Sequence, residues 1–214
     1  LHGAVRLGQV RDRDAELGIR RAGGQVGMGL RVQGGVEAEP DPSRNGLVDL
    51  WAAGRVVGGS SSINGMVWVR GNRWDYDHWA SLGCDGWDYE SVLPIFKRLE
   101  HFTGEGDPAY RGFAGPQYVS MGRAHHLLTD AFIDAAQEAG HRYNPDYNGV
   151  EQEGVALGQL SQKSGLRHSA ANAYVTRARR KQNFTLRTDA GATRILFEGR
   201  TAVGLSYHAG LLSL

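Results

Sequence analysis

A run of two glycines and three serines is the part of the chain best suited to binding chemistry. Gly58 and Gly59 carry no side chain, so their backbone amides can approach a charged or planar group closely. The serines that follow, Ser60 to Ser62, add short hydroxyl donors. If a helix begins after Ser62, its exposed amides would favour an anion such as a pyrophosphate. Taken alone, the run is more often an ordinary surface turn, because glycine and serine dominate turns.

Other residues with reactive or ligand-type side chains favour simpler interpretations. His125 and His126 are adjacent, so their side chains point apart on a strand or helix and make a poor metal pair. Cys84 lies in an expected turn and is more simply a packed or idle thiol than a nucleophile. The basic cluster at 177–181 reads as the solvated end of a helix rather than a nucleic-acid patch. We therefore assign no metal site.

The composition is that of an ordinary globular protein. Hydrophobic residues make up 41% and charged residues 22% of 214, and the net charge of +1 gives no case for nucleic acid as a partner. A single cysteine excludes an internal disulfide, which allows a reducing compartment, and we expect a cytoplasmic protein. We expect no transmembrane segment, since no run of 18 apolar residues occurs, and the first residues lack a signal-peptide core.

The elements that must position the loop are predicted from spacing and caps. Trp74, Tyr76 and Trp79 are spaced so that a short helix could bury one aromatic side. Asp88 is a plausible N-cap for a helix to about residue 100, although Pro94 predicts a late start or a bend. Two further helices are expected at about 127–139, where Gly140 ends the helix, and at about 169–179. Strands are expected at 184–188, 192–197 and 202–207, and a turn at 198–200 joins the last two.

The N-terminal segment has a different character. Residues 1–36 hold nine glycines and six arginines, and the first 50 residues contain no Phe, Trp or Tyr. Such a stretch can bury little apolar surface against its ordering entropy. We leave 1–36 unassigned.

The spacing around the glycine–serine run is far more specific than the run itself. Residues 54–64, followed by Trp68, Gly71 and Asp77, resemble the first sequence signature of the glucose–methanol–choline (GMC) oxidoreductases throughout its length. These are FAD-dependent alcohol oxidases and dehydrogenases, and the likeness is strongest to the choline and primary-alcohol dehydrogenase branch. It recurs at 146–149, 165–171 and 194–204, covering about 37–208, which corresponds to the front-middle third of a full family member.

The resemblance implies a mixed α/β fold. A family member combines a Rossmann-type FAD/NAD(P)-binding domain with a substrate domain built on an antiparallel sheet, and we expect this chain to hold both incompletely. On that basis 37–109 is the FAD-binding loop region, 110–180 is part of the substrate-binding domain, and 181–214 supplies strands returning to the FAD domain. With the N-terminal sheet absent, the edges of these strands would be exposed, which predicts poor solubility in isolation.

The resemblance also implies which residues hold FAD. The residues that match the family's cofactor loop around the pyrophosphate and ribityl chain are Arg55, Gly58, Gly59, Ser60 and Ser61. Those that match the stretch beside the isoalloxazine ring are Asn64, Gly65 and Met66, where amides can stabilise negative charge on the reduced flavin. Ala192 matches a position that contacts the adenine through its backbone.

One position implies how the flavin is attached. Some family members link FAD covalently through a His placed immediately before the Asn of this loop. The chain has Ile63 there, so we expect FAD to be bound non-covalently.

Two parts needed for catalysis are not found. The glycines at 23–29 have the wrong spacing for the Gly-x-Gly-x-x-Gly turn that opens the family's FAD domain. The family's catalytic His is expected beyond Leu214, so we assign no catalytic residue.

Three functions remain open from sequence. The first is oxidation of a small-molecule alcohol, primary or choline-like, with hydride passing to flavin N5 and an undetermined electron acceptor. The second is a non-catalytic, truncated remnant of such an enzyme. A remote third is a small-molecule kinase, whose glycine–serine loop also holds phosphate but which would need a pocket Lys or Asp and ligands for Mg²⁺.

Overall fold

The computed structural model describes residues 33–123 and 126–209. The described chain falls into two compact units, one formed by 60–173 and the other by 33–59 together with 174–209. The glycines at 23–29 lie outside the described residues. The family domains expected at 37–109, 110–180 and 181–214 stay a prediction. No helix among the described residues is long and apolar enough to cross a membrane.

Two capped helices build the core of the 60–173 unit. Helix α2 (Arg73–Ser81) begins with a capping box. The Asn72 side chain accepts a hydrogen bond from the Trp74 amide, and the Asp75 side chain accepts one from the Asn72 amide. Helix α3 (Tyr89–Leu99) begins at the predicted cap, where the Asp88 side chain accepts from the Ser91 amide. A second hydrogen bond, from the Ser91 hydroxyl, is the main reason that the pKa of Asp88 lies below its ordinary value. Pro94 lies inside α3 without delaying its start.

The core between these helices contains fewer aromatic residues than the sequence suggested. Its buried members are Tyr76, Tyr89, Val92 and Leu93. Trp74 is 66% exposed, so the expectation that it shares a buried side with Tyr76 is wrong. At 3.6 residues per turn, positions 74 and 76 lie about 200° apart around the helix. Trp74 instead stacks on the His78 ring, with ring centroids 4.8 Å apart.

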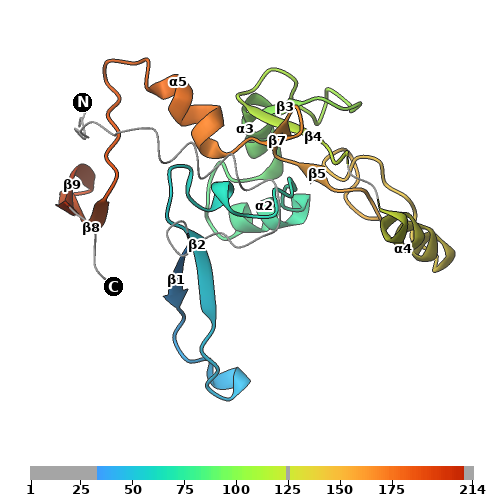
Figure 1. Ribbon diagram of the computed structural model, residues 1–214, viewed down its shortest axis with the longest axis horizontal. Helices are drawn as coiled ribbons and strands as arrows, with labels where there is room; N and C mark the ends of the chain where they lie inside the picture. Colours follow the sequence, from blue (N-terminus) through green and yellow to red (C-terminus); the bar gives the residue numbers. More distant parts are fainter. Residues whose placement is uncertain (1–32, 124–125, 210–214) are drawn as a thin grey trace. The chain divides into compact units, whose positions relative to one another are not determined.

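A small mixed sheet packs with α3 in the same unit (Figure 1). Strand β3 (Glu100–Phe102) runs parallel to β4 (Gln117–Met121), and β4 runs antiparallel to β5 (Gln159–Leu160). Strands β6 (Gln162–Lys163) and β7 (Leu166–Arg167) form a tight hairpin. Ser164 and Gly165 both have positive φ, which is the turn geometry that matches the twist of two antiparallel strands.

A fully buried carboxylate, that of Glu100, organises this unit. Its two oxygens accept from Arg111 Nη2 at 2.8 Å and from Arg111 Nε at 2.9 Å, a bidentate pair. Arg70 Nη2 and Trp68 Nε1 each donate to it at 2.8 Å, and the Gly112 amide donates at 3.0 Å. Five donors therefore satisfy one carboxylate inside the protein, as a buried charge requires.

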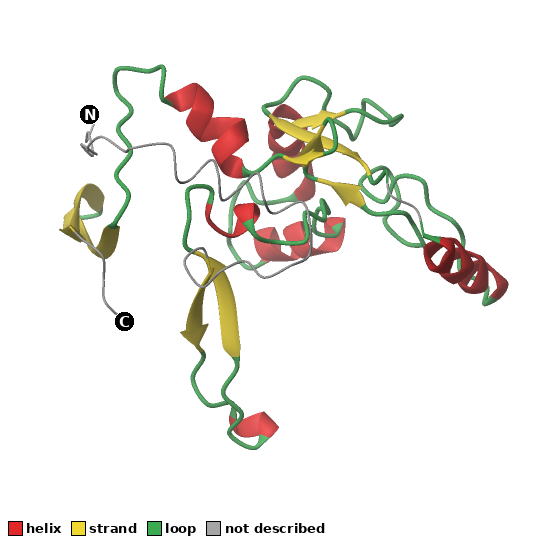
Figure 2. Ribbon diagram, viewed as in Figure 1, coloured by secondary structure: helices red, strands yellow, loops and turns green. Residues whose placement is uncertain are grey.

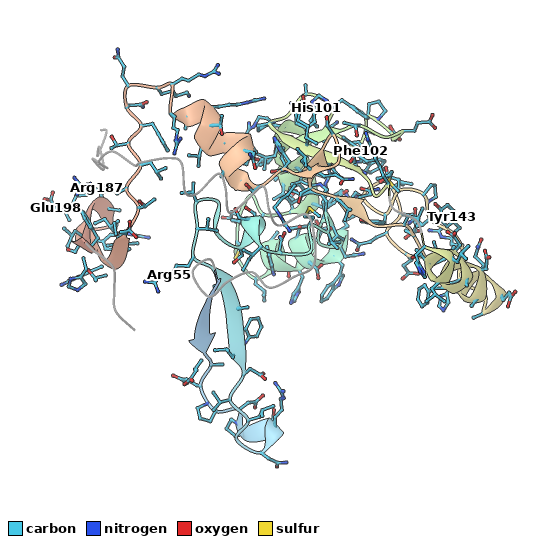
Figure 3. The ribbon with its side chains drawn as sticks, viewed as in Figure 1. Arg55, His101, Phe102, Tyr143, Arg187 and Glu198 are labelled. Atoms are coloured by element: carbon cyan, nitrogen blue, oxygen red, sulfur yellow. The ribbon has the colours of Figure 1, made fainter. Side chains whose placement is uncertain are left out.

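The second arginine extends the network across the sheet. Arg111 Nη1 donates to Asp146 Oδ1 and to Gln159 Oε1, and its guanidinium lies 3.6 Å from the centre of the Phe102 ring, which is labelled in Figure 3. Asn148 Nδ2 donates to Gln159 Oε1 at 2.8 Å and to the Trp68 carbonyl at 3.0 Å. We call this set the Glu100 network: Trp68, Arg70, Glu100, Arg111, Asp146, Asn148 and Gln159. Its two arginines balance its two carboxylates.

The other elements of 60–173 lie outside this core. Helix α4 (Leu127–Glu138) confirms the helix predicted for 127–139. His126 is its N-cap, with Nδ1 accepting from the Leu128 amide at 3.2 Å, which gives this histidine a structural use. The apolar face of α4 that contains Leu128 and Phe132 is exposed, and only Ile133 is buried.

Hairpins make up the strands of the other unit (Figure 2). Strand β1 (Gln33–Glu37) pairs antiparallel with β2 (Leu50–Gly54), with a short 3₁₀ turn (Pro42–Arg44) between them. Strand β8 (Ala190–Glu198) pairs antiparallel with β9 (Thr201–Ala209), which confirms the two predicted strands and their turn. The strand predicted at 184–188 is wrong: this stretch is irregular, since no described strand pairs with it. The helix predicted at 169–179 forms over a shorter span, as a π-helical turn (Ala171–Val175) that continues into α5 (Thr176–Ala178).

The Glu100 network makes a testable stability prediction. Glu100→Gln removes the negative charge that pairs with Arg70 and Arg111, both of which are buried. It also places an amide N–H against N–H donors of these arginines. We expect a loss of about 3 kcal/mol or more in the free energy of unfolding, the usual cost of breaking a buried ion pair. Denaturant titration followed by tryptophan fluorescence measures it, with Glu90→Gln as control because Glu90 pairs with Arg73 on the surface. Equal unfolding midpoints for the two variants would contradict this role.

Candidate functional site

The first part of the proposed flavin loop follows β2 in the unit that contains 33–59. The chain turns at Val56–Gly59, where the Gly59 amide donates to the Val56 carbonyl at 2.8 Å. Gly58 and Gly59 have φ values of 96° and 57°, the left-handed region that glycine enters without a Cβ penalty. A Cβ built on Gly59 would meet nothing within 4 Å, so the backbone there is open to a ligand. Arg55 is exposed just before this turn.

The serines form a single 3₁₀ turn (Gly59–Ser62), with Ser62 buried. The amides of Ile63 and Asn64 both donate to the Ser60 carbonyl, at 3.1 and 2.9 Å. The possibility of a helix beginning after Ser62 is therefore not realised, and the next helix is α2. The prediction of an anion site at the start of a helix after Ser62 is therefore wrong. The 3₁₀ turn is only four residues long, and no helix follows it directly.

Asn64 and Met66 define the end of the loop. Asn64 Oδ1 accepts from the Met66 amide at 3.0 Å, an Asx-type turn. Met66 has φ of 65°, a conformation that costs a residue with a Cβ roughly 1 kcal/mol or more. The surrounding structure holds it there: the Ser161 amide and hydroxyl donate to the Met66 carbonyl at 2.8 and 3.2 Å.

Arg167 is a site residue that the sequence analysis missed. It donates to the Ser61 carbonyl at 3.1 Å, to the Asn64 carbonyl at 2.7 Å and to Asn64 Oδ1 at 2.9 Å. Close by, the Ala170 amide donates to the Ser61 hydroxyl at 3.0 Å. The family-like segment 165–171 was the available signal, but spacing alone did not connect it to a loop about a hundred residues earlier. Burial lowers the pKa of Arg167.

The structure brings part of the predicted set together. Ser60, Ser61, Asn64, Gly65 and Met66 lie in one continuous loop of the 60–173 unit. Arg55, Gly58 and Gly59 belong to the other unit, as does Ala192, which lies exposed in β8 opposite Tyr207 of β9.

Two features of the loop are compatible with a flavin ligand. Gly65 is exposed, and a Cβ built on it would meet nothing within 4 Å. Both donors to the Asn64 side chain end on Oδ1, so its Nδ2 must face the other way, and no acceptor among the described residues takes its hydrogens. Open backbone beside a fixed amide donor suits a planar ligand that is rich in acceptors, and the residues present therefore fit FAD.

Two other features of the described chain do not enter this site. A shallow cavity of about 280 Å³ lies in the 60–173 unit between 70–73 and 147–152, lined also by Tyr89 and Tyr110, and no predicted site residue borders it. Within 33–123 and 126–209, no group of three or more His, Cys, Asp or Glu side chains is arranged to hold a metal ion.

Comparison with known proteins shows a family that the chain resembles over most of its length. A family model described as GMC oxidoreductase matches residues 18–211, so the match begins earlier than the resemblance traced from about residue 37. The chain is 44% identical over 176 residues to an oxygen-dependent choline dehydrogenase of Brucella anthropi, covering 82% of this chain and 32% of that protein. It is 45% identical over 156 residues to the enzyme of the same name from Vibrio vulnificus, covering 72% and 28%.

Two solved structures share the fold. Pyridoxine 4-oxidase from Mesorbium loti superposes with a TM-score of 0.75 at 26% identity, covering 96% of this chain and 40% of that one. An FAD-dependent oxidoreductase from Chaetomium thermophilum gives 0.73 at 30% identity, covering 82% and 32%.

The chain spans about a third of the length of the curated relatives it matches. The family model nevertheless covers most of the chain, and the identity to the relatives is well above 30%. The mixed α/β elements, the glycine–serine loop and its fit to FAD agree with that match. The chain therefore belongs to the GMC oxidoreductase family.

Proposed function

We propose that the protein is an FAD-dependent oxidoreductase that acts on the CH–OH group of a primary alcohol, with choline-like alcohols as the first substrates to test. The observation that carries the proposal is the loop from Ser60 to Met66, held by Arg167 and Ser161 with its glycine backbone and the Asn64 amide left accessible. Support for the substrate class comes from relatives named choline dehydrogenase at 44% identity.

The residues of this chain supply binding and orientation. A bound FAD would supply the hydride-accepting chemistry, at N5, for oxidation of the alcohol to an aldehyde. Gly58, Gly59, Ser60 and Ser61 would lie along the pyrophosphate and ribityl chain, with Arg55 at the start of the loop. Asn64, Gly65 and Met66 would lie beside the ring, where Asn64 Nδ2 can donate to an acceptor that gains negative charge on reduction. Ala192 would contact the adenine through its backbone.

We assign no base for the hydroxyl proton within this chain. The second candidate function is a non-catalytic remnant of such an enzyme. Family membership argues against the third candidate, the kinase. The electron acceptor is left open between dioxygen and another oxidant.

Reduction of bound flavin tests the activity. The complete gene product that contains this chain is mixed anaerobically with choline or a simple primary alcohol while the visible flavin absorbance is followed. We expect bleaching with substrate and recovery on admission of air or an artificial acceptor. Bound flavin that no alcohol bleaches would favour the remnant, and a protein that takes up no flavin would overturn the cofactor assignment as well.

Two glycines with nearly equal positive φ offer a matched pair of variants. Gly59 and Gly199 have φ of 57° and 59°, and a Cβ on either meets nothing within 4 Å. Each change to Ala should therefore cost the unliganded protein a similar left-handed penalty of about 1 kcal/mol. Only Gly59→Ala should weaken FAD, since its methyl group enters the space assigned to the ligand. Fluorescence titration of FAD measures this, and equal affinities for the two variants would remove Gly59 from the site.

The mode of attachment has a simple assay. Because Ile63 occupies the position that precedes Asn64, no histidine is available there for a covalent link. We expect denaturation in acid or urea to release all flavin into the filtrate. Flavin that stays with the precipitated protein would show a covalent bond elsewhere and contradict the prediction.

A further inference from the structure

We propose that Arg167 is a positioning residue that locks the Asn64 side chain in one amide orientation and so aims Nδ2 at the flavin ring. The proposal rests on the proposed function, because it assumes that FAD occupies the loop. Arg167 reaches the loop from the end of β7, about a hundred residues later in the chain. This role would make Arg167 a part of the proposed flavin site, although Arg167 lies outside the loop.

The three hydrogen bonds of Arg167 span the loop from one side. Nη1 donates to the Ser61 carbonyl and to Asn64 Oδ1, while Nη2 donates to the Asn64 carbonyl. One planar guanidinium therefore fixes the backbone at both ends of the Ser61–Asn64 turn and the side chain at its end. The distances of 2.7–3.1 Å are those of ordinary hydrogen bonds.

The two donors around the Asn64 side chain determine which atom of its amide group faces Arg167. Oδ1 accepts from Arg167 Nη1 and from the Met66 amide, and both partners can only donate. A flipped amide would place N–H groups against two N–H donors, which costs both hydrogen bonds. Asn64 Nδ2 is therefore held on the opposite, exposed side as a preorganised donor.

The planar, forked guanidinium of Arg167 makes this arrangement specific to arginine. No carboxylate pairs with it in the described part of the chain, and burial lowers its pKa. Its cation is solvated by carbonyl oxygens of the loop, which a rigid fork can satisfy together. A lysine would keep the charge, but its single ammonium cannot reproduce the geometry of the fork.

Neighbouring contacts hold Arg167 itself in place. The hairpin of β6 and β7 closes with Ser164 and Gly165 in the left-handed region, and the His168 amide donates to the Ser161 carbonyl at 2.9 Å. Ser161 also binds the Met66 carbonyl, so the same short segment supports both sides of Asn64. The Ala170 amide, on the Ser61 hydroxyl, adds a further tie.

The test compares Arg167→Met and Arg167→Lys with wild type in the complete gene product. Arg142→Met is the matched control, since Arg142 forms an exposed ion pair with Glu151 in the same unit. The readouts are the FAD dissociation constant, the visible spectrum of the bound flavin and its midpoint potential at saturating FAD. A residue that only stabilises the fold would leave the spectrum and the potential unchanged once FAD saturates the protein.

We expect Arg167→Met to weaken FAD binding roughly tenfold to a hundredfold, as loss of charge-assisted hydrogen bonds does. The midpoint potential should fall, because a misaimed amide no longer stabilises the reduced ring, and Arg167→Lys should restore little of either loss. In an Asn64→Ala background, Arg167→Met should change the potential much less than it does alone.

The outcomes separate the two proposals. Arg167→Met with the wild-type spectrum and potential at saturation would overturn the positioning role while leaving FAD binding intact. Full rescue by Arg167→Lys would overturn it too, since charge alone would then suffice. A wild-type protein that binds no FAD would overturn both the positioning role and the proposed function.

Discussion

The bidentate pair between Glu100 and Arg111 is the interaction on which the 60–173 unit depends. Both side chains are fully buried, and each is neutralised by the other, with Arg70 as a second partner of Glu100 and Asp146 as a second partner of Arg111. Around them the Glu100 network joins the end of the proposed flavin loop, through Trp68 and Arg70, to β3 and to the turn at 146–148. Trp68 is thus a donor to a buried carboxylate.

The loop is consequently fixed from two directions. On the Trp68 side, the Glu100 network and the pairing of Val67 with Leu160 tie the chain to the small sheet. On the other side, Arg167 binds the Ser61–Asn64 turn. Between these anchors Met66 is held in a left-handed conformation and Gly65 is open. A rigid frame with an accessible middle is what a cofactor site needs, because the donors are then ordered before the ligand arrives.

Local patterns in the sequence predicted several helices and strands correctly. They could not predict contacts between residues that are far apart in the sequence. Asp88 as an N-cap, α4, and the β8–β9 hairpin followed from caps, periodicity and turn residues, all of which act within a few positions. The strand at 184–188 failed, since a strand also needs a partner that local pattern cannot supply. Arg167 was missed for the same reason: its partners lie about a hundred residues away. The identity of the loop came from its resemblance to a family, because glycine and serine alone indicate only an open backbone.

Hydrogen–deuterium exchange with and without FAD is the most direct test of the claim that this loop is the flavin site. We expect FAD to slow exchange of the amides from Gly58 to Met66, while α4 and the turn at Gly199 keep their exchange rates. Such protection would place the ligand on this loop without depending on catalysis. FAD that binds yet leaves 58–66 unchanged, while protecting another segment of the chain, would contradict the account.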